Sequence, residues 1–373
     1  MPAPYPPKVN ETAPAWEDIE RTPLPSLTSD ITRDVCVVGL GASGLAAVDE
    51  ALGLGLSVVG IDAGVVAGGA AGRNGGFLLA GMAAFHHEVA ALLGNERAAD
   101  LYRATQVEVD ATPGARRTGS LRIADDDELA DCERQLVAML HDGLPVERYE
   151  GPEGKGLLFP NDGSFHPIRR CLEAAARHAA HLHEHTPAID IDETGTSVRT
   201  PQGTITCGAV VVAVDGALEH VLPELRGRVR TARAQMLATA PTDEITLTRP
   251  VYARWGYDYW QQLTDGRIVI GGCRDRFAED EWGAPPTPTA QVQAALEAIV
   301  RDRLGVSAPI THRWAGAIAF TDDKLPVLEE VRTGVWAAGA YSGTGNVVGP
   351  LTARAALRRA VGHPSRWADL LAH

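Results

Sequence analysis

The chain has 373 residues, 45% hydrophobic and 22% charged, so it can bury a large core and is predicted to form two domains. Its 34 basic and 48 acidic residues give a net charge of −14, which argues against a nucleic-acid partner. It has no apolar stretch long enough to span a membrane, no signal sequence, and five cysteines without C-x-x-C spacing. We therefore expect a cytoplasmic protein with no membrane partner.

Residues 1–29 are rich in proline and turn-forming residues, with Trp16 as the one large apolar anchor. This composition predicts an N-terminal arm that lies on the surface of the protein rather than a folded unit.

The segment from residue 34 to residue 62 contains the most informative motif. A short apolar run predicts a buried strand, and Gly39, Gly41 and Gly44 then form G-x-G-x-x-G before a helical pattern and a second apolar strand. Asp62 ends that strand, 18 residues after Gly44, where a carboxylate can bind ribose hydroxyls. The first glycine permits the turn, the second lets a pyrophosphate approach, and the third permits close packing. The segment predicts a dinucleotide site.

Small residues dominate the next stretch, from residue 63 to residue 72, which is followed by Arg73-Asn-Gly-Gly-Phe77. Such side chains cannot form a packed core, so they favour backbone pressed against a planar ligand. The alternative is a flexible surface linker.

Helical and strand patterns alternate through the rest of the chain. Helices are predicted over residues 83–109, 125–140, 168–180, 287–304 and 350–360, and strands over residues 117–124, 183–191, 209–214, 231–240, 250–264, 266–272 and 334–339. The last strand leads through the glycine-rich turn YSGTGNVVG into the last helix. This second strand–turn–helix predicts that the C-terminus returns to close the dinucleotide site.

These motifs, together with TGSLRIA, DGSFHP, VVVAVDG and DYWQQLTDGRIVIGG, resemble the flavin amine-oxidase family typified by D-amino-acid oxidase, glycine oxidase and sarcosine oxidase. Within it, the chain is most similar to glycine oxidases and γ-glutamylputrescine oxidases. The resemblance implies an α/β fold with a Rossmann-like FAD-binding domain and an α+β substrate domain built on an antiparallel sheet. The implied FAD-binding domain comprises residues 30–85, 155–225 and 311–373, and the substrate domain comprises residues 86–154 and 226–310.

The resemblance also implies cofactor contacts at particular positions. It places Gly39, Gly41, Ser43 and Gly44 at the FAD pyrophosphate, Asp62 at the ribose, Arg73, Asn74, Gly75 and Gly76 along the isoalloxazine, Ala188 at the adenine end, and Gly343, Thr344, Gly345 and Asn346 at the flavin pyrimidine edge. The AAGRNGG and YSGTGN stretches contain no cysteine or histidine, so we expect the FAD to be noncovalent.

Two positions depart from the family pattern. Thr344 stands where many γ-glutamylputrescine-oxidase-like sequences have histidine. The run Trp314–Phe320 lacks the arginine that binds the substrate carboxylate in glycine oxidase, which leaves Arg254 and Arg73 as candidates. The aromatic residues that can form a pocket wall are Trp255, Tyr257, Tyr259, Trp260 and Tyr341. We expect Tyr257 and Tyr259 to share a strand face, with Trp260 facing away from both. We expect Tyr259, Tyr341 and Arg254 to contact substrate; the alternative for the aromatic residues is ordinary packing.

The implied reaction moves a hydride equivalent from the carbon that bears nitrogen to flavin N5, and O2 is then reduced to H2O2. An amino acid or N-substituted glycine is the favoured substrate, giving glyoxylate and a free amine after imine hydrolysis. The alternatives are a γ-glutamylated or free polyamine, a flavin dehydrogenase that uses an electron carrier, and an NAD(P)-binding protein.

Lys324 could assist oxygen reduction or make a surface contact. The histidines His178, His181, His183 and His185 suggest a metal site, and His183 and His185 could share a strand face, but no cysteine or nearby acidic ligand completes it.

Overall fold

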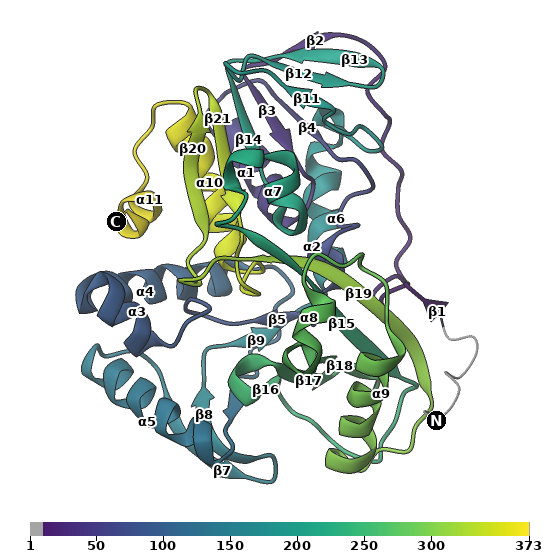
Figure 1. The fold of residues 1–373 in the computed structure, drawn as a ribbon, viewed down its shortest axis with the longest axis vertical. Coiled ribbons are helices and arrows are strands. Elements are labelled where there is room, and N and C mark those ends of the chain that lie inside the picture. Colours follow the sequence, from purple (N-terminus) through teal and green to yellow (C-terminus); the bar gives the residue numbers. More distant parts are fainter. Residues whose placement is uncertain (1–9, 373) are drawn as a thin grey trace.

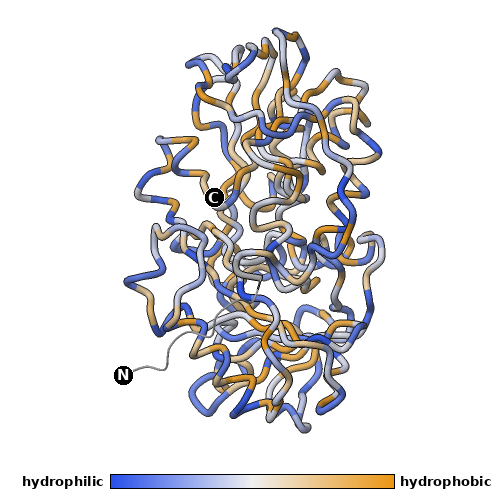
Figure 2. The backbone as a smooth tube through the Cα atoms, turned by 90° about the vertical axis from the view of Figure 1, so that its right-hand side faces the viewer, coloured by the Kyte–Doolittle hydropathy of each residue, from blue (hydrophilic) through white to orange (hydrophobic). Residues whose placement is uncertain are grey.

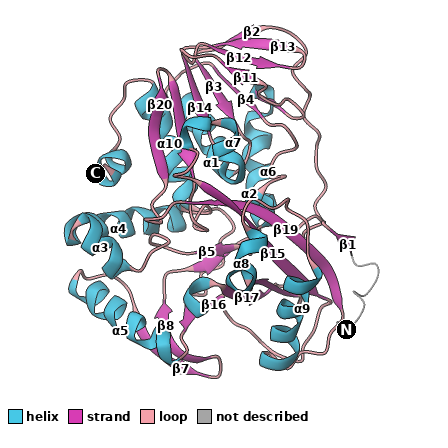
Figure 3. Ribbon diagram, in the orientation of Figure 1, coloured by secondary structure: helices cyan, strands magenta, loops and turns pink. Residues whose placement is uncertain are grey.

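Two large β-sheets occupy opposite halves of the molecule (Figure 1). The structure is a computed structural model that describes residues 10–372. Helices lie against both sheets (Figure 3), and one sheet is mainly parallel while the other is mainly antiparallel. The mixed α/β fold predicted from the sequence is confirmed.

The upper sheet in Figure 1 joins strands from distant parts of the chain. Within the described residues, its spatial order is β10 (Leu182–His183), β4 (Val58–Ile61), β3 (Val35–Val38), β14 (Ala209–Val212), β21 (Val335–Gly339) and β20 (Val327–Arg332). Neighbouring strands from β10 to β21 are parallel, and β20 pairs antiparallel with β21 at the edge. Every residue of β3, β4 and β14 is buried, as expected for apolar strands with both faces covered.

Three helices pack in one hydrophobic cluster against this sheet, namely α1 (Ala42–Gly53), α6 (Pro167–His178) and α10 (Val348–Ala360). The approach of α1 is closest at Gly44, where a Cβ atom would lie 1.7 Å from the carbonyl oxygen of Gly39. Glycine is therefore required at position 44 for the helix to pack against the turn that precedes it.

The lower sheet carries the longest strands of the described chain. Its order is β1 (Asn10–Glu11), β19 (Ile310–Phe320), β15 (Arg230–Thr239), β18 (Ile268–Gly272), β17 (Asp258–Gln262), β16 (Val251–Ala253), β6 (Ser120–Ile123), β8 (Gly154–Phe159) and β7 (Glu147–Gly151). Pairing is antiparallel except between β1 and β19 and between β16 and β6. Helix α9 (Ala290–Ala298) packs on one face and shares a hydrophobic cluster with β17 and β18.

Shorter elements complete the two halves. The small strands are β2 (Ile31–Thr32), β11 (Asp190–Ile191), β12 (Ser197–Thr200), β13 (Gly203–Thr206), β5 (Phe77–Leu78) and β9 (Gly163–Ser164), and the remaining helices are α2 (Ala70–Arg73), α3 (His86–Leu93), α4 (Asn95–Ala111), α5 (Asp126–His141), α7 (Leu218–Val221), α8 (Ala278–Glu281) and α11 (Arg366–Leu371). Helix α11 follows the last helix predicted from the sequence and was not expected. It packs against α10 and α4.

The chain passes between the two large sheets several times. Strands β8 and β19 belong to the lower sheet, although the predicted boundaries at residues 155 and 311 assign most of each to the FAD-binding domain. Because β8 and β19 belong to the lower sheet, the chain leaves that half of the molecule near residues 160 and 321. The division into two domains stays a prediction. In the N-terminal arm, residues 1–9 lie outside the described chain, and Trp16 is buried, with its indole N–H donating to the Asn74 carbonyl at 2.9 Å.

The prediction of a single strand over residues 250–264 was wrong. The chain folds there into a hairpin in which β16 pairs antiparallel with β17 and Tyr252 faces Tyr259. Arg254, Trp255 and Gly256 form the turn, with φ angles of 51°, 55° and 86°. Consecutive left-handed residues reverse the chain direction, so alternation of side chains cannot continue through them. The predicted shared strand face of Tyr257 and Tyr259 is therefore also incorrect, because Tyr257 lies in the turn.

The helix predicted over residues 83–109 is two helices, α3 and α4, separated by Gly94. This glycine has a φ of 88°, outside the right-handed helical region, so it ends one helix and starts the next.

Hydrophobic segments run through the interior of both halves, and the outer turns are mainly hydrophilic (Figure 2). Among residues 10–372, no helix combines the length and apolar character needed to cross a membrane.

Candidate active site

The glycine-rich turn between β3 and α1 forms one end of a cavity. Gly39 has a φ of 104°, and a Cβ atom there would lie 2.6 Å from the Ala213 carbonyl oxygen. Gly41 lines this cavity, and among the described residues the only atom within 4 Å of a Cβ built there is the Ala71 Cβ, at 3.3 Å. The backbone of α1 is therefore exposed to a ligand at its first turn, where N–H groups lack partners within the helix.

Asp62 lies at the end of β4 and lines the same cavity. Its carboxylate accepts hydrogen bonds from the backbone N–H groups of Leu40, at 2.7 Å, and Gly64, at 2.8 Å. Burial raises the pKa of this carboxyl, although both hydrogen bonds oppose that change. A carboxylate has about four acceptor positions, so Asp62 fixes the turn and retains capacity to accept from a ribose hydroxyl.

Two adjoining cavities, of about 310 Å³ and about 590 Å³, extend from this turn into the lower half of the molecule. The residues that line both are Ala70, Arg73, Asn74, Gly316, Ile318, Gly343 and Asn346. Gly39, Gly41, Ser43, Asp62 and Gly345 line the smaller cavity, and Gly75, Thr344 and Tyr259 line the larger. The structure thus brings most of the residues predicted to bind the cofactor to one continuous wall.

Hydrogen bonds join the loop after α2 to the C-terminal glycine-rich turn. The Asn346 side-chain amide donates to the side-chain oxygen of Asn74, at 3.0 Å, and to the Phe77 carbonyl, at 2.9 Å. The Asn74 side chain in turn donates to the carbonyls of Ala70 and Ala71. These contacts place the C-terminus against the glycine-rich half of the site, as predicted from the second strand–turn–helix.

Arg73 is held by backbone carbonyl groups rather than by an acid. Its guanidinium donates to Gly68, at 3.0 Å, to Thr12, at 2.8 Å, and to Ala315, at 3.0 Å. The Trp314 indole N–H donates to the Arg73 carbonyl at 2.8 Å. Arg73 therefore ties the loop to β19, and most of its donors are occupied.

Aromatic rings form one wall of the larger cavity. The rings of Tyr252 and Tyr259 lie 5.7 Å apart, and Phe77 meets both edge-on, at 5.2 Å and 5.9 Å. Burial raises the pKa of the Tyr252 hydroxyl to about 12 and raises that of Tyr259 further, so both hydroxyls stay protonated at neutral pH. Trp255 and Tyr257 also line this cavity. Tyr252 was missed in the sequence because only the hairpin places it opposite Tyr259.

Tyr341 and Trp260 lie away from this wall. Tyr341 is 3% exposed and lines the smaller cavity, where burial raises the pKa of its hydroxyl and neighbouring Ser43 opposes the change. Trp260 is packed in the core beneath the sheet. Tyr341 is thus placed beside the first turn of α1 rather than at the aromatic wall.

Besides Trp260, four residues predicted at the site do not line either cavity. Arg254 donates to Asp258, at 2.7 Å, and to Asp275, at 2.8 Å, so its guanidinium is occupied by two carboxylates. The others are Gly44, Gly76 and Ala188. The arginines that do line the larger cavity are Arg73, Arg122, Arg230 and Arg274, and sequence reasoning missed the last three.

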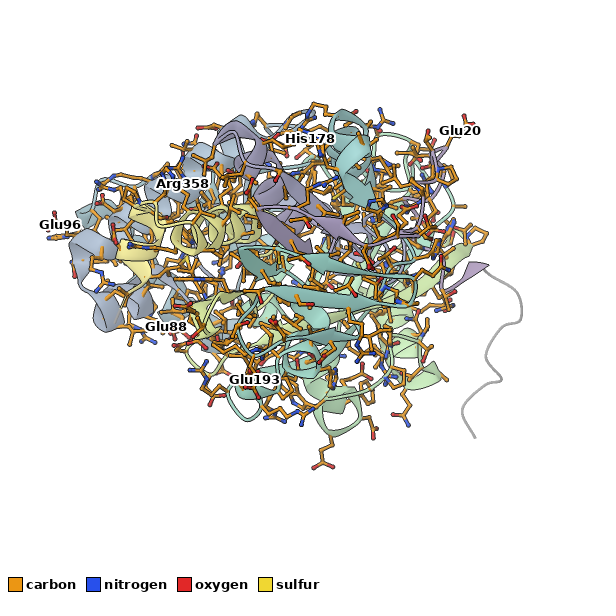
Figure 4. All side chains as sticks on the ribbon, turned by 90° about the horizontal axis from the view of Figure 1, so that it is seen from above. Glu20, Glu88, Glu96, His178, Glu193 and Arg358 are labelled. Atoms are coloured by element: carbon orange, nitrogen blue, oxygen red, sulfur yellow. The ribbon has the colours of Figure 1, made fainter. Side chains whose placement is uncertain are left out.

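The remaining polar candidates have local partners. Lys324 lines the larger cavity, and its ammonium lies 3.7 Å from Glu88. His178 lies near the outer surface (Figure 4), with a ring nitrogen 2.7 Å from the Asp49 carboxylate. Within the described residues, no three His, Cys, Asp or Glu side chains are grouped to hold a metal ion.

Asp162 gives the site a testable dependence on pH. It is 3% exposed, and burial raises the pKa of its carboxyl to about 7, although hydrogen bonds from Ala80 N, at 2.9 Å, and Ser120 Oγ, at 2.7 Å, oppose the change. As the pH rises, the Asp162 carboxyl of the unfolded chain, with a pKa of about 4, therefore loses its proton before that of the folded chain. The stabilisation from Asp162 is complete below about pH 4 and is lost as the pH rises towards 7.

We expect the Asp162→Asn variant to gain stability relative to the parent protein as the pH rises from 4.5 to 8, by roughly 2–4 kcal/mol. Urea unfolding at several pH values measures this difference, with the exposed Asp110→Asn as the control. Parallel pH profiles for the Asp162→Asn variant and the parent protein would contradict the assignment.

Comparison with known proteins gives a consistent result. Residues 34–359 match the family model described as DAO, FAD dependent oxidoreductase. The chain is 26% identical to the probable oxidoreductase OrdL of Rhizobium meliloti (strain 1021), over 91% of this chain and 86% of that protein. It is also 26% identical to the gamma-glutamylputrescine oxidoreductase of Escherichia coli (strain K12), over 87% and 82%. Glycine oxidase from Geobacillus kaustophilus superposes with a TM-score of 0.71 at 20% identity, covering 90% of this chain and 96% of that one.

Proposed function

Since this chain belongs to the family of FAD-dependent oxidoreductases, we propose that it uses its FAD to oxidise an amine that carries a carboxylate. The favoured substrates are an amino acid and an N-substituted glycine. Oxygen is the proposed electron acceptor, and the cytoplasm is the proposed compartment because all five cysteines are buried, unpaired thiols.

The residues present fit FAD. Gly41 leaves open space where a Cβ atom would otherwise project into the smaller cavity, and the first turn of α1 offers N–H groups to a pyrophosphate. We assign the ribose to Asp62 and the isoalloxazine to the wall shared by the two cavities, which contains Asn74 and Asn346. No cysteine lines either cavity, which supports noncovalent binding.

The charge of the larger cavity is the observation that supports a carboxylated substrate. Five cationic side chains line it, namely Arg73, Arg122, Arg230, Arg274 and Lys324, against the carboxyls of Asp162 and Asp322. Asp162 is in part protonated at neutral pH, because burial raises its pKa to about 7. A cationic wall attracts a carboxylate and repels a free polyamine, whose amines are charged.

Bound FAD supplies the two-electron oxidant for the carbon that bears nitrogen. For an N-substituted glycine, the balanced reaction consumes the substrate, O2 and H2O, and it yields glyoxylate, a primary amine and H2O2. The protein must bind the amine in its neutral form, orient it and exclude bulk water. Tyr259 and Tyr252 are placed to contact the substrate from the aromatic wall, where their protonated hydroxyls can donate hydrogen bonds.

The relative named gamma-glutamylputrescine oxidoreductase supports a second candidate, a γ-glutamylated diamine, which also carries a carboxylate. A dehydrogenase that passes electrons to a carrier is a further alternative for the same site. Substrate and acceptor can be tested separately.

We expect glycine, sarcosine and longer N-alkylglycines to be oxidised at least tenfold more efficiently, as kcat/KM, than putrescine. The physical reason is that the carboxylate accepts a charge-assisted hydrogen bond that putrescine cannot form, worth roughly 1.5 kcal/mol or more. Peroxide release measures oxidase activity, and dye reduction under anaerobic conditions measures electron transfer that is independent of oxygen. Preference for putrescine would contradict the proposed substrate class, and dye reduction without peroxide release would favour the dehydrogenase.

A further inference from the structure

Two guanidinium groups lie against the same indole ring in the larger cavity. The guanidinium carbon of Arg230, at the start of β15, lies 4.2 Å from the centroid of the Trp282 ring. That of Arg274, which follows β18, lies 4.9 Å from Trp282 and 4.6 Å from the Phe320 ring. Trp282 and Phe320 meet edge-on, at 5.6 Å. Four separate segments of the chain thus build one aromatic and cationic surface.

Arg274 has no polar partner among residues 10–372. It is half-buried, its guanidinium forms no hydrogen bond or ion pair there, and burial lowers its pKa. The carboxylates whose charge acts on Arg274 are those of Asp275 and Glu281, and both are occupied. Asp275 pairs with Arg254, and Glu281 pairs with Arg233. The positive charge of Arg274 is therefore left without a counter-ion in contact.

The other half-buried arginines of the cavity are better compensated. Arg73 donates to three carbonyl groups. The charge of Arg122 lies close enough to Asp162 and Glu128 to oppose the rise in pKa that burial causes in both. Arg274 thus differs from Arg122 in that the carboxylates that act on its charge, Asp275 and Glu281, are each paired with another arginine.

Burying a cation costs free energy unless an anion pairs with it, and Arg274 has a second cation, Arg230, on the same indole ring. We propose that Arg274, with Arg230 adding positive charge at the exposed rim, forms the subsite that binds the carboxylate of the substrate. This proposal rests on the proposed function and assigns the specificity of that site. Arg230 faces Phe320 directly across the β15–β19 pair, so the charge missing from the run Trp314–Phe320 is supplied by neighbouring strands. Trp282 and Phe320 orient the Arg274 guanidinium by stacking.

The test uses the flavin-containing enzyme and propionate, an unreactive carboxylate, with propionamide as its uncharged counterpart. Titration followed by flavin absorbance measures binding without turnover. We expect Arg274→Gln to weaken propionate binding roughly 10- to 100-fold, the loss of a hydrogen bond to a charged group, and to leave propionamide binding unchanged. Arg274→Lys keeps the charge but not the fork-shaped donor, so we expect a smaller loss of propionate binding. This variant takes the place of Arg274→Gln in the test if the glutamine variant does not retain FAD.

The matched control is Arg276→Gln, on the same turn. Arg276 is exposed, does not line the cavity and lies 3.7 Å from Asp258. Propionate binding in this variant should equal that of the parent protein. The subsite would be overturned if Arg276→Gln lost as much propionate binding as Arg274→Gln. It would also be overturned if neither Arg274→Gln nor Arg274→Lys had an effect, or if the parent protein did not bind propionate.

Steady-state kinetics provide the second readout. Arg274→Gln should raise KM for carboxylated amines by the same 10- to 100-fold with a smaller change in kcat, because the contact exists in the ground state as well. If the parent protein oxidises no amine but binds propionate through Arg274, the proposed function fails and the subsite stands. If it oxidises amines and the arginine variants bind propionate normally, the subsite fails and the function stands.

Discussion

Replacement of Gly41 by valine is expected to give a folded protein that purifies without FAD. Among the described residues, the only atom within 4 Å of a Cβ at this position is the Ala71 Cβ, at 3.3 Å, so the added side chain requires a shift of only a few tenths of an ångström there and extends along the wall of the smaller cavity. It would then occupy the space in which a pyrophosphate must approach the backbone. Loss of two charge-assisted hydrogen bonds, roughly 1.5 kcal/mol each, weakens FAD binding on the order of a hundredfold or more.

The absorbance ratio of flavin to protein measures the bound FAD, and far-UV circular dichroism checks the fold. Gly53→Val is the matched control, because Gly53 lies at the other end of α1 and has no atom within 4 Å of a built Cβ. The control should retain flavin. A Gly41→Val protein with stoichiometric FAD would show that the turn does not bind the pyrophosphate.

Truncation of Glu281 to alanine is expected to lower the free energy of unfolding by about 3–5 kcal/mol, the largest stability effect expected of a single change here. The Arg233 and Glu281 side chains are 7% and 1% exposed and form two hydrogen bonds, at 2.7 Å and 2.9 Å. The Gln235 amide, from the cavity wall, also donates to Glu281. Without Glu281, the Arg233 cation stays buried with no carboxylate, and its desolvation is uncompensated.

Urea-induced unfolding of the flavin-containing protein measures the change. Glu133→Ala, which removes an exposed ion pair with Arg148, should cost less than about 1 kcal/mol. Replacing the buried pair together, as Arg233→Met with Glu281→Leu, should recover most of the loss because no isolated charge remains. If Glu281→Ala cost no more than Glu133→Ala, the buried pair would not stabilise this half of the molecule.

Much of the cofactor site was predictable from the sequence because its determinants are close together in the chain. The turn at Gly39, the cavity-facing Gly41 and the packing at Gly44 follow from backbone conformation and from the absence of a Cβ atom. The apolar strand that ends at Asp62 follows from hydropathy over a few residues. Asn346 was predicted by resemblance, and its contact with Asn74 agrees with the expected return of the C-terminus.

The substrate end of the site was much less predictable. The run around Arg254 has a strand-like pattern, but left-handed residues turn it into a hairpin, which places Tyr252 beside Tyr259. Arg254 looked available in the sequence, yet Asp258 and Asp275 neutralise it in the structure. No local rule predicts which arginine finds a carboxylate, because that depends on which strands become neighbours.

Steric limits on the backbone and hydrophobic periodicity act over a few residues, so the amino-acid order alone was enough to specify the α/β fold, the dinucleotide turn and the acidic end of β4. The shared surface of Arg230, Arg274 and Trp282 exists only in the folded chain. These residues come from segments joined by long-range strand pairing and by the bridge between Ala232 and Trp282. Arg274 remains unpaired within the described residues because its neighbouring carboxylates bind other arginines, a result set by the competition among all the charges that folding brings together.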